Sequence, residues 1–307
     1  MLKQPEESIL SLLGRVAQKD RRALARGISM IENEAPGYEN LLQNIRVQNQ
    51  TPIIGITGPP GAGKSTLISA LVRHLIAEGK TLAVLAIDPS SPFNHGALMG
   101  DRVRMSEHFL HDAVFIRSMA SRGSLGGLAP RIYEVAELMK TAGFDYILIE
   151  TVGVGQSEVE IAGLADSTIL VMVPEAGDEI QTIKSGIMEI ADIFVVNKAD
   201  REGADLFYNS LAKLAHQYAY KGWEAPVVKT VATYETGLTD LVTALHRHLD
   251  LANNSEKKNT LLAEKAMMLI REYRTRNISF EKLQAELKVQ QQQSGFNLFK
   301  FVAEYNG

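Results

Sequence analysis

The sequence has no cysteine among its 307 residues. Without thiols the chain cannot form a disulfide, a thiolate metal site or a cysteine nucleophile, which fits a reducing compartment. It also lacks an apolar run long enough to cross a bilayer. Residues 1–17 carry two glutamates and a broken apolar pattern, unlike a signal or transit peptide. These absences predict a cytoplasmic protein with no membrane partner.

The sequence also lacks an excess of basic residues, since 32 Lys and Arg stand against 36 Asp and Glu, for a formal net charge of -4. A nucleic-acid partner is therefore not expected. The hydrophobic content of 45% and the charged content of 22% are those of a globular protein with a large core.

The most informative segment present is a glycine-rich loop at residues 58–65, which fits the pattern G-x-x-x-x-G-K-[ST]. It follows an apolar run at 53–57 and opens a helical pattern at 66–76, so we predict a strand, a phosphate-binding loop and a helix. Backbone N–H groups of such a loop point at a phosphate, the lysine reaches the terminal phosphates, and the serine hydroxyl can bind Mg²⁺. The residues expected to bind the phosphates are Gly58, Pro59, Pro60, Gly61, Ala62, Gly63, Lys64, Ser65 and Thr66.

Hydrophobic patterning predicts an α/β fold with a doubly wound, mainly parallel sheet. Short apolar runs typical of strands buried on both faces occur at 82–87, 113–116, 146–149, 168–173, 193–196 and 227–231. Helices are expected between them, including 127–141 and 238–249.

Helical patterns also flank this region. Residues 6–45 read as helical, with Asp20 as an N-cap, and the chain beyond residue 251 reads as two helices, at 261–274 and after the N-cap Ser279. We expect an N-terminal helical extension at 1–47, an α/β domain with the phosphate loop at 48–251 and a C-terminal helical arm at 252–307.

The segment Asn197-Lys198-Ala199-Asp200 predicts recognition of guanine. The carboxylate of Asp200 only accepts hydrogen bonds, so it can take the ring N–H and the exocyclic amine of guanine, whereas adenine presents a lone pair there. A backbone N–H of Val231, Ala232 or Thr233, after the last expected strand, could contact the guanine carbonyl.

Three carboxylates stand where Mg²⁺ on a nucleotide would need them. Asp88 and Glu150 end expected strands, and Asp101 lies in the loop after Asp88. Each has the alternative role of a helix cap or an ion-pair partner. His95, His108 and His111 are unevenly spaced and are read as surface or loop residues, not as a metal site.

Together these segments resemble the MeaB/ArgK family of P-loop GTPases. The resemblance rests on five blocks in order and covers about 21–249. The blocks are Gly-Pro-Pro-Gly-Ala-Gly-Lys-Ser-Thr at 58–66, Asp-Pro-Ser-Ser-Pro at 88–92, Gly-Asp-Arg-Val-Arg-Met at 100–105, Glu-Thr-Val-Gly-Val-Gly-Gln-Ser-Glu at 150–158 and Asn-Lys-Ala-Asp at 197–200.

The resemblance implies a homodimeric metallochaperone that binds GTP or GDP with Mg²⁺. It makes residues 48–251 the P-loop GTPase domain and residues 252–307 the helical arm for dimerisation. The expected partner of the metallochaperone is a cobalamin-dependent acyl-CoA mutase, usually methylmalonyl-CoA mutase, for which it would gate adenosylcobalamin loading and prevent inactivation. Hydrolysis of GTP is expected to be slow alone and stimulated by the partner.

The resemblance also implies roles for single residues. Ser65, Asp88, Asp101 and Glu150 correspond to the Mg²⁺ neighbourhood, and residues 174–184 correspond to an additional switch. The expected catalytic residues are Lys64, Asp88, Asp101, Glu150 and Lys184. The expected switch residues are Gly153, Gly155, Gln156, Glu175, Asp178, Glu179 and Gln181.

Two other functions are compatible with a guanine-specific phosphate loop. One is a GTPase that inserts nickel into hydrogenase or urease, although such proteins usually offer Cys or His ligands. The other is a non-catalytic scaffold in which GTP only stabilises the fold.

Overall fold

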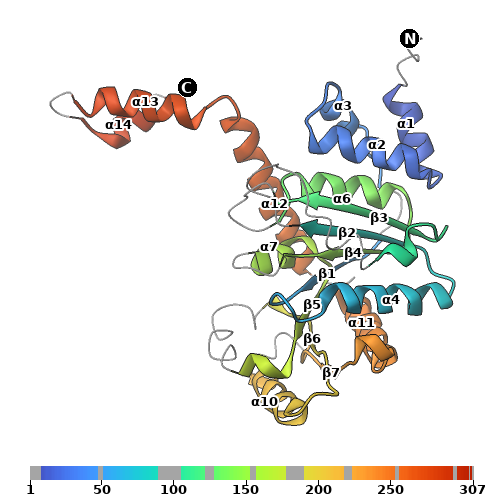
Figure 1. Ribbon diagram of the computed structural model, residues 1–307. Helices are drawn as coiled ribbons and strands as arrows, with labels where there is room; N and C mark the ends of the chain where they lie inside the picture. Colours follow the sequence, from blue (N-terminus) through green and yellow to red (C-terminus); the bar gives the residue numbers. More distant parts are fainter. Residues whose placement is uncertain are drawn as a thin grey trace. The chain divides into compact units, whose positions relative to one another are not determined.

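Seven strands form one parallel sheet, in the order β3-β2-β4-β1-β5-β6-β7 (Figure 1). The computed structural model describes residues 8–47, 51–88, 105–121, 128–152, 157–177, 190–217, 223–252, 256–292, 296–303 and 305. The strands are β1 (Ile53–Thr57), β2 (Leu82–Asp88), β3 (Val114–Ala120), β4 (Tyr146–Glu150), β5 (Ser167–Met172), β6 (Ile193–Val196) and β7 (Val227–Lys229). The expected doubly wound α/β fold is confirmed.

The centre of the sheet places the phosphate loop. Strands β1, β2, β4, β5 and β6 are buried at every residue, as their continuous apolar sequences predict. Strand β1 lies between β4 and β5, with Ile54 opposite both Leu148 and Ser167. In an open α/β sheet the ligand crevice lies at the carboxyl ends of the strands, where the strand order reverses. The loop after β1 is therefore at the expected binding position.

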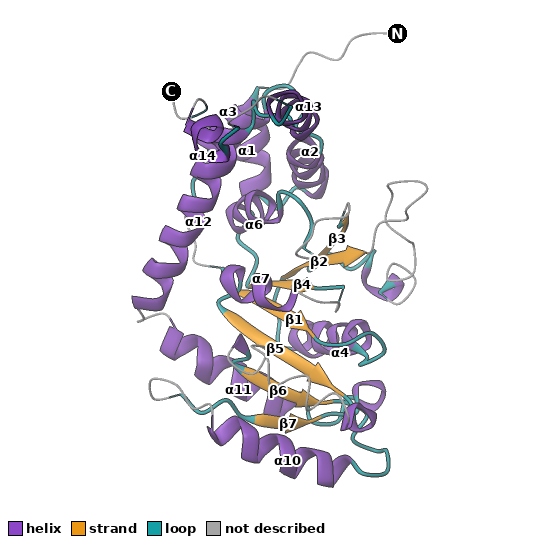
Figure 2. Cartoon of the chain, turned by 90° about the vertical axis from the view of Figure 1, so that its left-hand side faces the viewer, coloured by secondary structure: helices purple, strands orange, loops and turns teal. Residues whose placement is uncertain are grey.

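Helices cover both faces of the sheet (Figures 1 and 2). α4 (Lys64–Ala77) and α11 (Leu238–Ala252) share a core with one face, while α6 (Ile132–Thr141) and α7 (Ser157–Leu164) share a core with the other. α10 (Ala204–Gln217) packs beside β6 and β7. α7 approaches β1 closely because Gly55 has no side chain, and a Cβ there would lie 2.5 Å from Cγ1 of Ile161.

The N-terminal segment contains three helices, α1 (Ile9–Ala17), α2 (Arg21–Glu32) and α3 (Tyr38–Gln43), and α6 lies between the sheet and α2. The predicted N-cap is confirmed: Asp20 accepts hydrogen bonds from the N–H groups of Arg22 and Ala23. The guanidinium of Arg21 donates to the carbonyl of Val114 at 2.6 Å, which ties α2 to the edge strand β3.

The chain divides into two compact units, Met1–Ser255 and Glu256–Gly307. The second unit contains α12 (Glu256–Thr275), α13 (Phe280–Gln290) and α14 (Leu298–Ala303). Ser279 caps α13 as predicted. The expectation of two helices here was wrong, because Asn297 accepts from the N–H groups of Phe299 and Lys300 and starts a third, short helix. The predicted boundaries at residues 47 and 251 stay predictions.

Several predicted bounds differ from the structure. α6 begins at Ile132, not at residue 127. β3 extends to Ala120, and β7 ends at Lys229 because the chain turns into the 3₁₀ helix η3 (Ala232–Tyr234). Two further 3₁₀ helices are η1 (Ser106–His108) and η2 (Pro174–Gly177). Among the described residues, no helix combines the length and apolar character that a bilayer crossing requires.

Candidate nucleotide-binding site

The phosphate loop has the backbone that its glycines allow. Gly58 and Gly63 have φ angles of 139° and 87°, which side chains with a Cβ rarely adopt. A Cβ at Gly58 would lie 2.0 Å from the carbonyl oxygen of Val171, and one at Gly63 would lie 2.5 Å from Nδ2 of Asn197. Helix α4 begins directly after Gly63, so its first N–H groups face the loop.

Lys64 lies across this loop and is buried, with 7% of its surface exposed. Its Nζ donates to the carbonyl oxygens of Gly58 at 2.8 Å and Pro59 at 3.2 Å. The ammonium is thus held at the mouth of the loop by neutral acceptors, which an anionic phosphate oxygen could replace with stronger charge-assisted hydrogen bonds.

Three predicted magnesium residues lie on elements of one sheet and the helix beside it: Asp88 and Glu150 end the neighbouring strands β2 and β4, and Ser65 is in the first turn of α4. Ser65 Oγ donates to Glu150 Oε1 at 2.7 Å, and both side chains are buried. Asp88, at the carboxyl end of β2, has only 1% of its surface exposed. A hydroxyl and two buried carboxylates form a hard oxygen donor set that fits Mg²⁺, which takes few protein ligands beside phosphates and water. Asp101 lies outside the described residues.

A buried pair of hydroxyls lies next to this donor set, and the sequence analysis did not predict it. Thr57 Oγ1 and Thr151 Oγ1 are 2.8 Å apart, and they join the end of β1 to the segment that leads into the predicted switch. The only signal was the position of each threonine at the carboxyl end of an expected strand: Thr57 ends the run 53–57, and Thr151 follows Glu150. Gly153, Gly155 and Gln156 lie outside the described residues.

Asn197 joins the phosphate loop to the segment after β7. Its Nδ2 donates to the carbonyl of Ala62 at 2.9 Å, and its Oδ1 accepts from Thr230 Oγ1 at 3.1 Å and from the N–H of Ala232 at 3.2 Å. Lys198 Nζ donates to the carbonyl of Gly61 at 2.8 Å. Two segments far apart in sequence, both predicted to bind nucleotide, are therefore held side by side.

Asp200 and the turn after β7 are available to a ligand. Asp200 is exposed, and its carboxylate makes no hydrogen bond with another residue that the structure describes. Val231 and Ala232 use their N–H groups within the protein, on Thr236 and Asn197. The N–H of Thr233 has no acceptor among the described residues, so it is the donor in this turn best placed to contact a base.

Glu175, from the predicted additional switch, lies in η2. It forms an ion pair with Arg201, which directly follows Asp200. Hydrogen bonding to Arg201 lowers the pKa of Glu175 below its ordinary value, and Glu175 is therefore ionised at neutral pH. The other predicted residues of that switch, Asp178, Glu179, Gln181 and Lys184, lie outside the described residues.

His108 was expected at the surface or in a loop. It lies in the short η1 before β3 and is not at the surface, because its side chain is 5% exposed and its Nε2 lies 2.9 Å from Ser69 Oγ. Burial lowers the pKa of His108, so the neutral ring is favoured. His111 is exposed, and His95 lies outside the described residues. In the described ranges, no group of three or more His, Cys, Asp or Glu residues is arranged to hold a metal ion.

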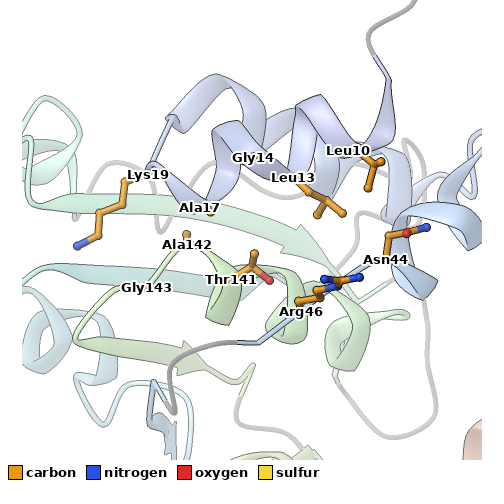
Figure 3. Close-up of a pocket in the computed structure, with 10 residues that line it drawn as sticks. All are labelled: Leu10, Leu13, Gly14, Ala17, Lys19, Asn44, Arg46, Thr141, Ala142 and Gly143. Carbon is orange, nitrogen blue, oxygen red and sulfur yellow. The ribbon is translucent and has the colours of Figure 1, made fainter.

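A separate cavity of about 530 Å³ lies away from these residues, between α1, the segment after α3 and the end of α6 (Figure 3). Leu10 and Leu13 line one side, while Arg46 and Thr141 line the other. None of its lining residues belongs to the predicted nucleotide site.

The fold and the site define a P-loop GTPase, a class that binds guanine nucleotides and usually depends on Mg²⁺. The model of the family described as methylmalonyl-CoA mutase-associated GTPase MeaB matches residues 24–288. The chain belongs to this family.

Relatives agree with this assignment. A putative GTPase of Pyrococcus abyssi is 45% identical, over 84% of this chain and 83% of that protein. The GTPase ArgK of Escherichia coli is 36% identical, over 77% and 74% of the two chains. The crystal structure of an LAO/AO transport system kinase has a TM-score of 0.71 and 25% identity, and the match covers 99% of this chain and 98% of that one.

Proposed function

We propose that this protein is a slow GTPase that acts as a metallochaperone, gating adenosylcobalamin loading into a cobalamin-dependent acyl-CoA mutase and protecting that mutase from inactivation. Methylmalonyl-CoA mutase is the partner to test, because the family is described as associated with it. The bridge that Asn197 makes between Ala62 and Ala232 carries the GTP-binding part of the proposal, since it joins the phosphate loop to the segment proposed to read the base.

In this proposal each half of the site reads one part of GTP. The carboxylate of Asp200 accepts the ring N–H and the amine of guanine, and the N–H of Thr233 donates to the guanine carbonyl. Lys64 and the N–H groups at the start of α4 bind the phosphates. Ser65, Asp88, Asp101 and Glu150 would hold Mg²⁺, which would neutralise charge on the phosphate oxygens.

The site supports slow hydrolysis in the absence of a partner. Lys64 is the only cation among the described residues of the phosphate loop, and positioned positive charge is the main agent of phosphoryl transfer. We propose that the ammonium of Lys184 completes the site when the mutase binds. Glu175 belongs to the same proposed switch. The cytoplasmic location stays a prediction.

We expect the mutase to raise multiple-turnover GTP hydrolysis, and we expect Lys184→Ala to lower the ratio of stimulated to basal rates by about tenfold or more, because a cation at the phosphates stabilises the transition state. Phosphate release is measured with and without a cobalamin-dependent acyl-CoA mutase from the same genome. Lys213→Ala, which changes an exposed lysine of α10, is the matched control and should leave the ratio unchanged.

Two outcomes would contradict this proposal. If hydrolysis with and without the mutase does not exceed that of Lys64→Ala, the protein is a scaffold that GTP only stabilises. If hydrolysis is present but no mutase changes it, the chaperone role fails. Tight binding of Ni²⁺ without nucleotide would instead favour nickel insertion.

We also propose that the second unit forms a homodimer. Its helices expose large apolar side chains, among them Tyr273 at 62%, Phe280 at 72% and Phe299 at 84%. Each such side chain gains roughly 1.5–3 kcal/mol when it is buried, so a second copy of the arm is a favourable partner.

We expect the protein to have a mass in solution of twice 33.7 kDa. Phe299→Ser should weaken dimerisation by about tenfold or more, because it removes apolar area from the interface. Light scattering across a concentration series measures both results. Leu206→Ser, at a leucine of α10 that is 76% exposed, is the control. A wild-type chain that stays monomeric at every concentration would refute the dimer.

A further inference from the structure

One face of α4 carries a row of polar residues beyond the phosphate loop. Ser65, Ser69 and Arg73 are spaced by four residues, so they follow one another along the helix. Ser65 contacts Glu150 in the predicted magnesium site. The residues that follow it in this row have no role in the proposed chemistry.

Ser69 and Arg73 bind the segment that precedes β3. Ser69 Oγ donates to Glu107 Oε1 at 2.7 Å and lies 2.9 Å from Nε2 of the buried His108. Arg73 pairs with the same carboxylate of Glu107 through NH1. Hydrogen bonding to Ser69 lowers the pKa of Glu107, so its carboxylate is ionised at neutral pH. The η1 segment is thereby tied to α4.

The second edge of the Arg73 guanidinium reaches the turn that carries Thr233. Nε of Arg73 donates to Glu235 Oε1 at 2.6 Å. Glu235 directly follows η3 and has a φ angle of 57°, and the Val231–Thr236 bridge closes the turn around it. Asn197 holds the start of this turn through Ala232, and Arg73 holds its end.

We propose that Arg73 is a positioning residue for guanine recognition: it holds the Val231–Thr236 turn against α4, so that the N–H of Thr233 is aimed at the carbonyl oxygen of the base. This inference rests on the proposed binding of guanine nucleotides and adds a residue that sets their specificity. Arg73 itself touches neither the base nor the phosphates.

The exposure of the Arg73–Glu235 ion pair indicates how much the loss of Arg73 would affect stability. Arg73 and Glu235 are 36% and 46% exposed, and single exposed ion pairs contribute little to stability. Loss of Arg73 should therefore leave the fold intact. Without Arg73 the turn would keep the Val231–Thr236 bridge but lose its ion pair with α4. A shift of the turn relative to α4 would weaken the hydrogen bond to the base, because such bonds depend steeply on distance and angle.

The test compares three diphosphates that differ only at the base: GDP, 6-thio-GDP and IDP. In 6-thio-GDP a sulfur, which is a weaker acceptor, replaces the carbonyl oxygen to which the N–H of Thr233 would donate. IDP lacks the exocyclic amine that would donate a hydrogen bond to Asp200. We expect Arg73→Ala to lower the preference for GDP over 6-thio-GDP by about three- to tenfold, the loss of roughly one hydrogen bond, measured as equilibrium dissociation constants. The preference for GDP over IDP should stay unchanged, because Asp200 lies on another loop.

Three further variants separate the contacts of Arg73, and a fourth serves as a control. Glu235→Ala, which removes the acceptor, should reproduce the loss, whereas Glu107→Ala should not, because Glu107 does not contact the turn. Arg247→Ala, at an exposed arginine of α11 with no ion pair among the described residues, is the matched control. Arg73→Lys should restore part of the preference, since an ammonium can pair with Glu235 but lacks the planar fork.

An equal loss of affinity for all three diphosphates would overturn the inference, because it would mark Arg73 as a residue that only stabilises the fold. Unchanged preferences in Arg73→Ala would overturn it as well. A wild-type chain that binds no GDP would refute the proposed function and this inference together, and it is recognised before any variant is made.

Discussion

Replacing Lys64 with alanine is expected to weaken GTP binding by about a hundredfold and to reduce hydrolysis to the background rate. Lys64 is 7% exposed, and its ammonium donates to the carbonyls of Gly58 and Pro59. Charge-assisted hydrogen bonds contribute about 1.5–3 kcal/mol each, and one or two of them to phosphate account for this loss. The same ammonium also stabilises the negative charge that develops on the phosphate in the transition state. The rate of hydrolysis should therefore fall further than the affinity for GTP.

The measurement is the dissociation constant of a non-hydrolysable GTP analogue, together with phosphate release. The unfolding temperature of the variant without nucleotide shows whether loss of the hydrogen bonds to the Gly58 and Pro59 carbonyls destabilises the fold. Lys213→Ala again serves as the control for a lysine outside the site. Equal affinity in Lys64→Ala and the wild type would mean that the loop does not bind phosphate as proposed.

Replacing Asp200 with asparagine is expected to shift the preference from GTP toward XTP by about a hundredfold or more. Guanine offers an amine to the carboxylate, whereas xanthine offers a carbonyl oxygen at the same position. The asparagine amide can donate to that oxygen while its own oxygen still accepts the ring N–H. The exposed carboxylate has no hydrogen bond with another described residue, so the exchange disturbs no other contact there.

Competition between GTP and XTP for the wild type and the variant measures this shift. Asp240→Asn removes an exposed carboxylate from the first turn of α11 and is the matched control. An unchanged ratio of the two affinities would show that Asp200 does not read the base. Weaker binding of both nucleotides without a change of ratio would assign Asp200 a structural role.

The central strands were predictable because parallel strands buried on both faces need continuous apolar sequences. The runs at β1, β4 and β6 stand out for this reason, and the structure confirms them as strands. The bounds of β3 and β7 were not predictable, because strands at the edge of the sheet do not need a continuous apolar sequence. β3 continues through Arg117 and Ser118, which are only partly buried.

The candidate site divides in the same way. The phosphate loop was predictable because its backbone depends on consecutive residues such as Gly58 and Gly63. The pairing of Thr57 with Thr151 and the burial of His108 were not, since each depends on a segment distant in the chain. The binding roles of the site residues stay predictions, and Asp101 and Lys184 lie outside the residues that the structure describes.

By itself the sequence determined the phosphate loop, the parallel sheet and the family, because these follow from local backbone rules and from apolar patterns along the chain. Only the tertiary structure decided that Asn197 joins the phosphate loop to the base turn and that Arg73 holds the far end of that turn. Arg73 and Glu235 are 162 residues apart, and the packing of η3 against α4 brings them together. Hydrogen bonds act over about 3 Å, so only the folded chain can select such partners.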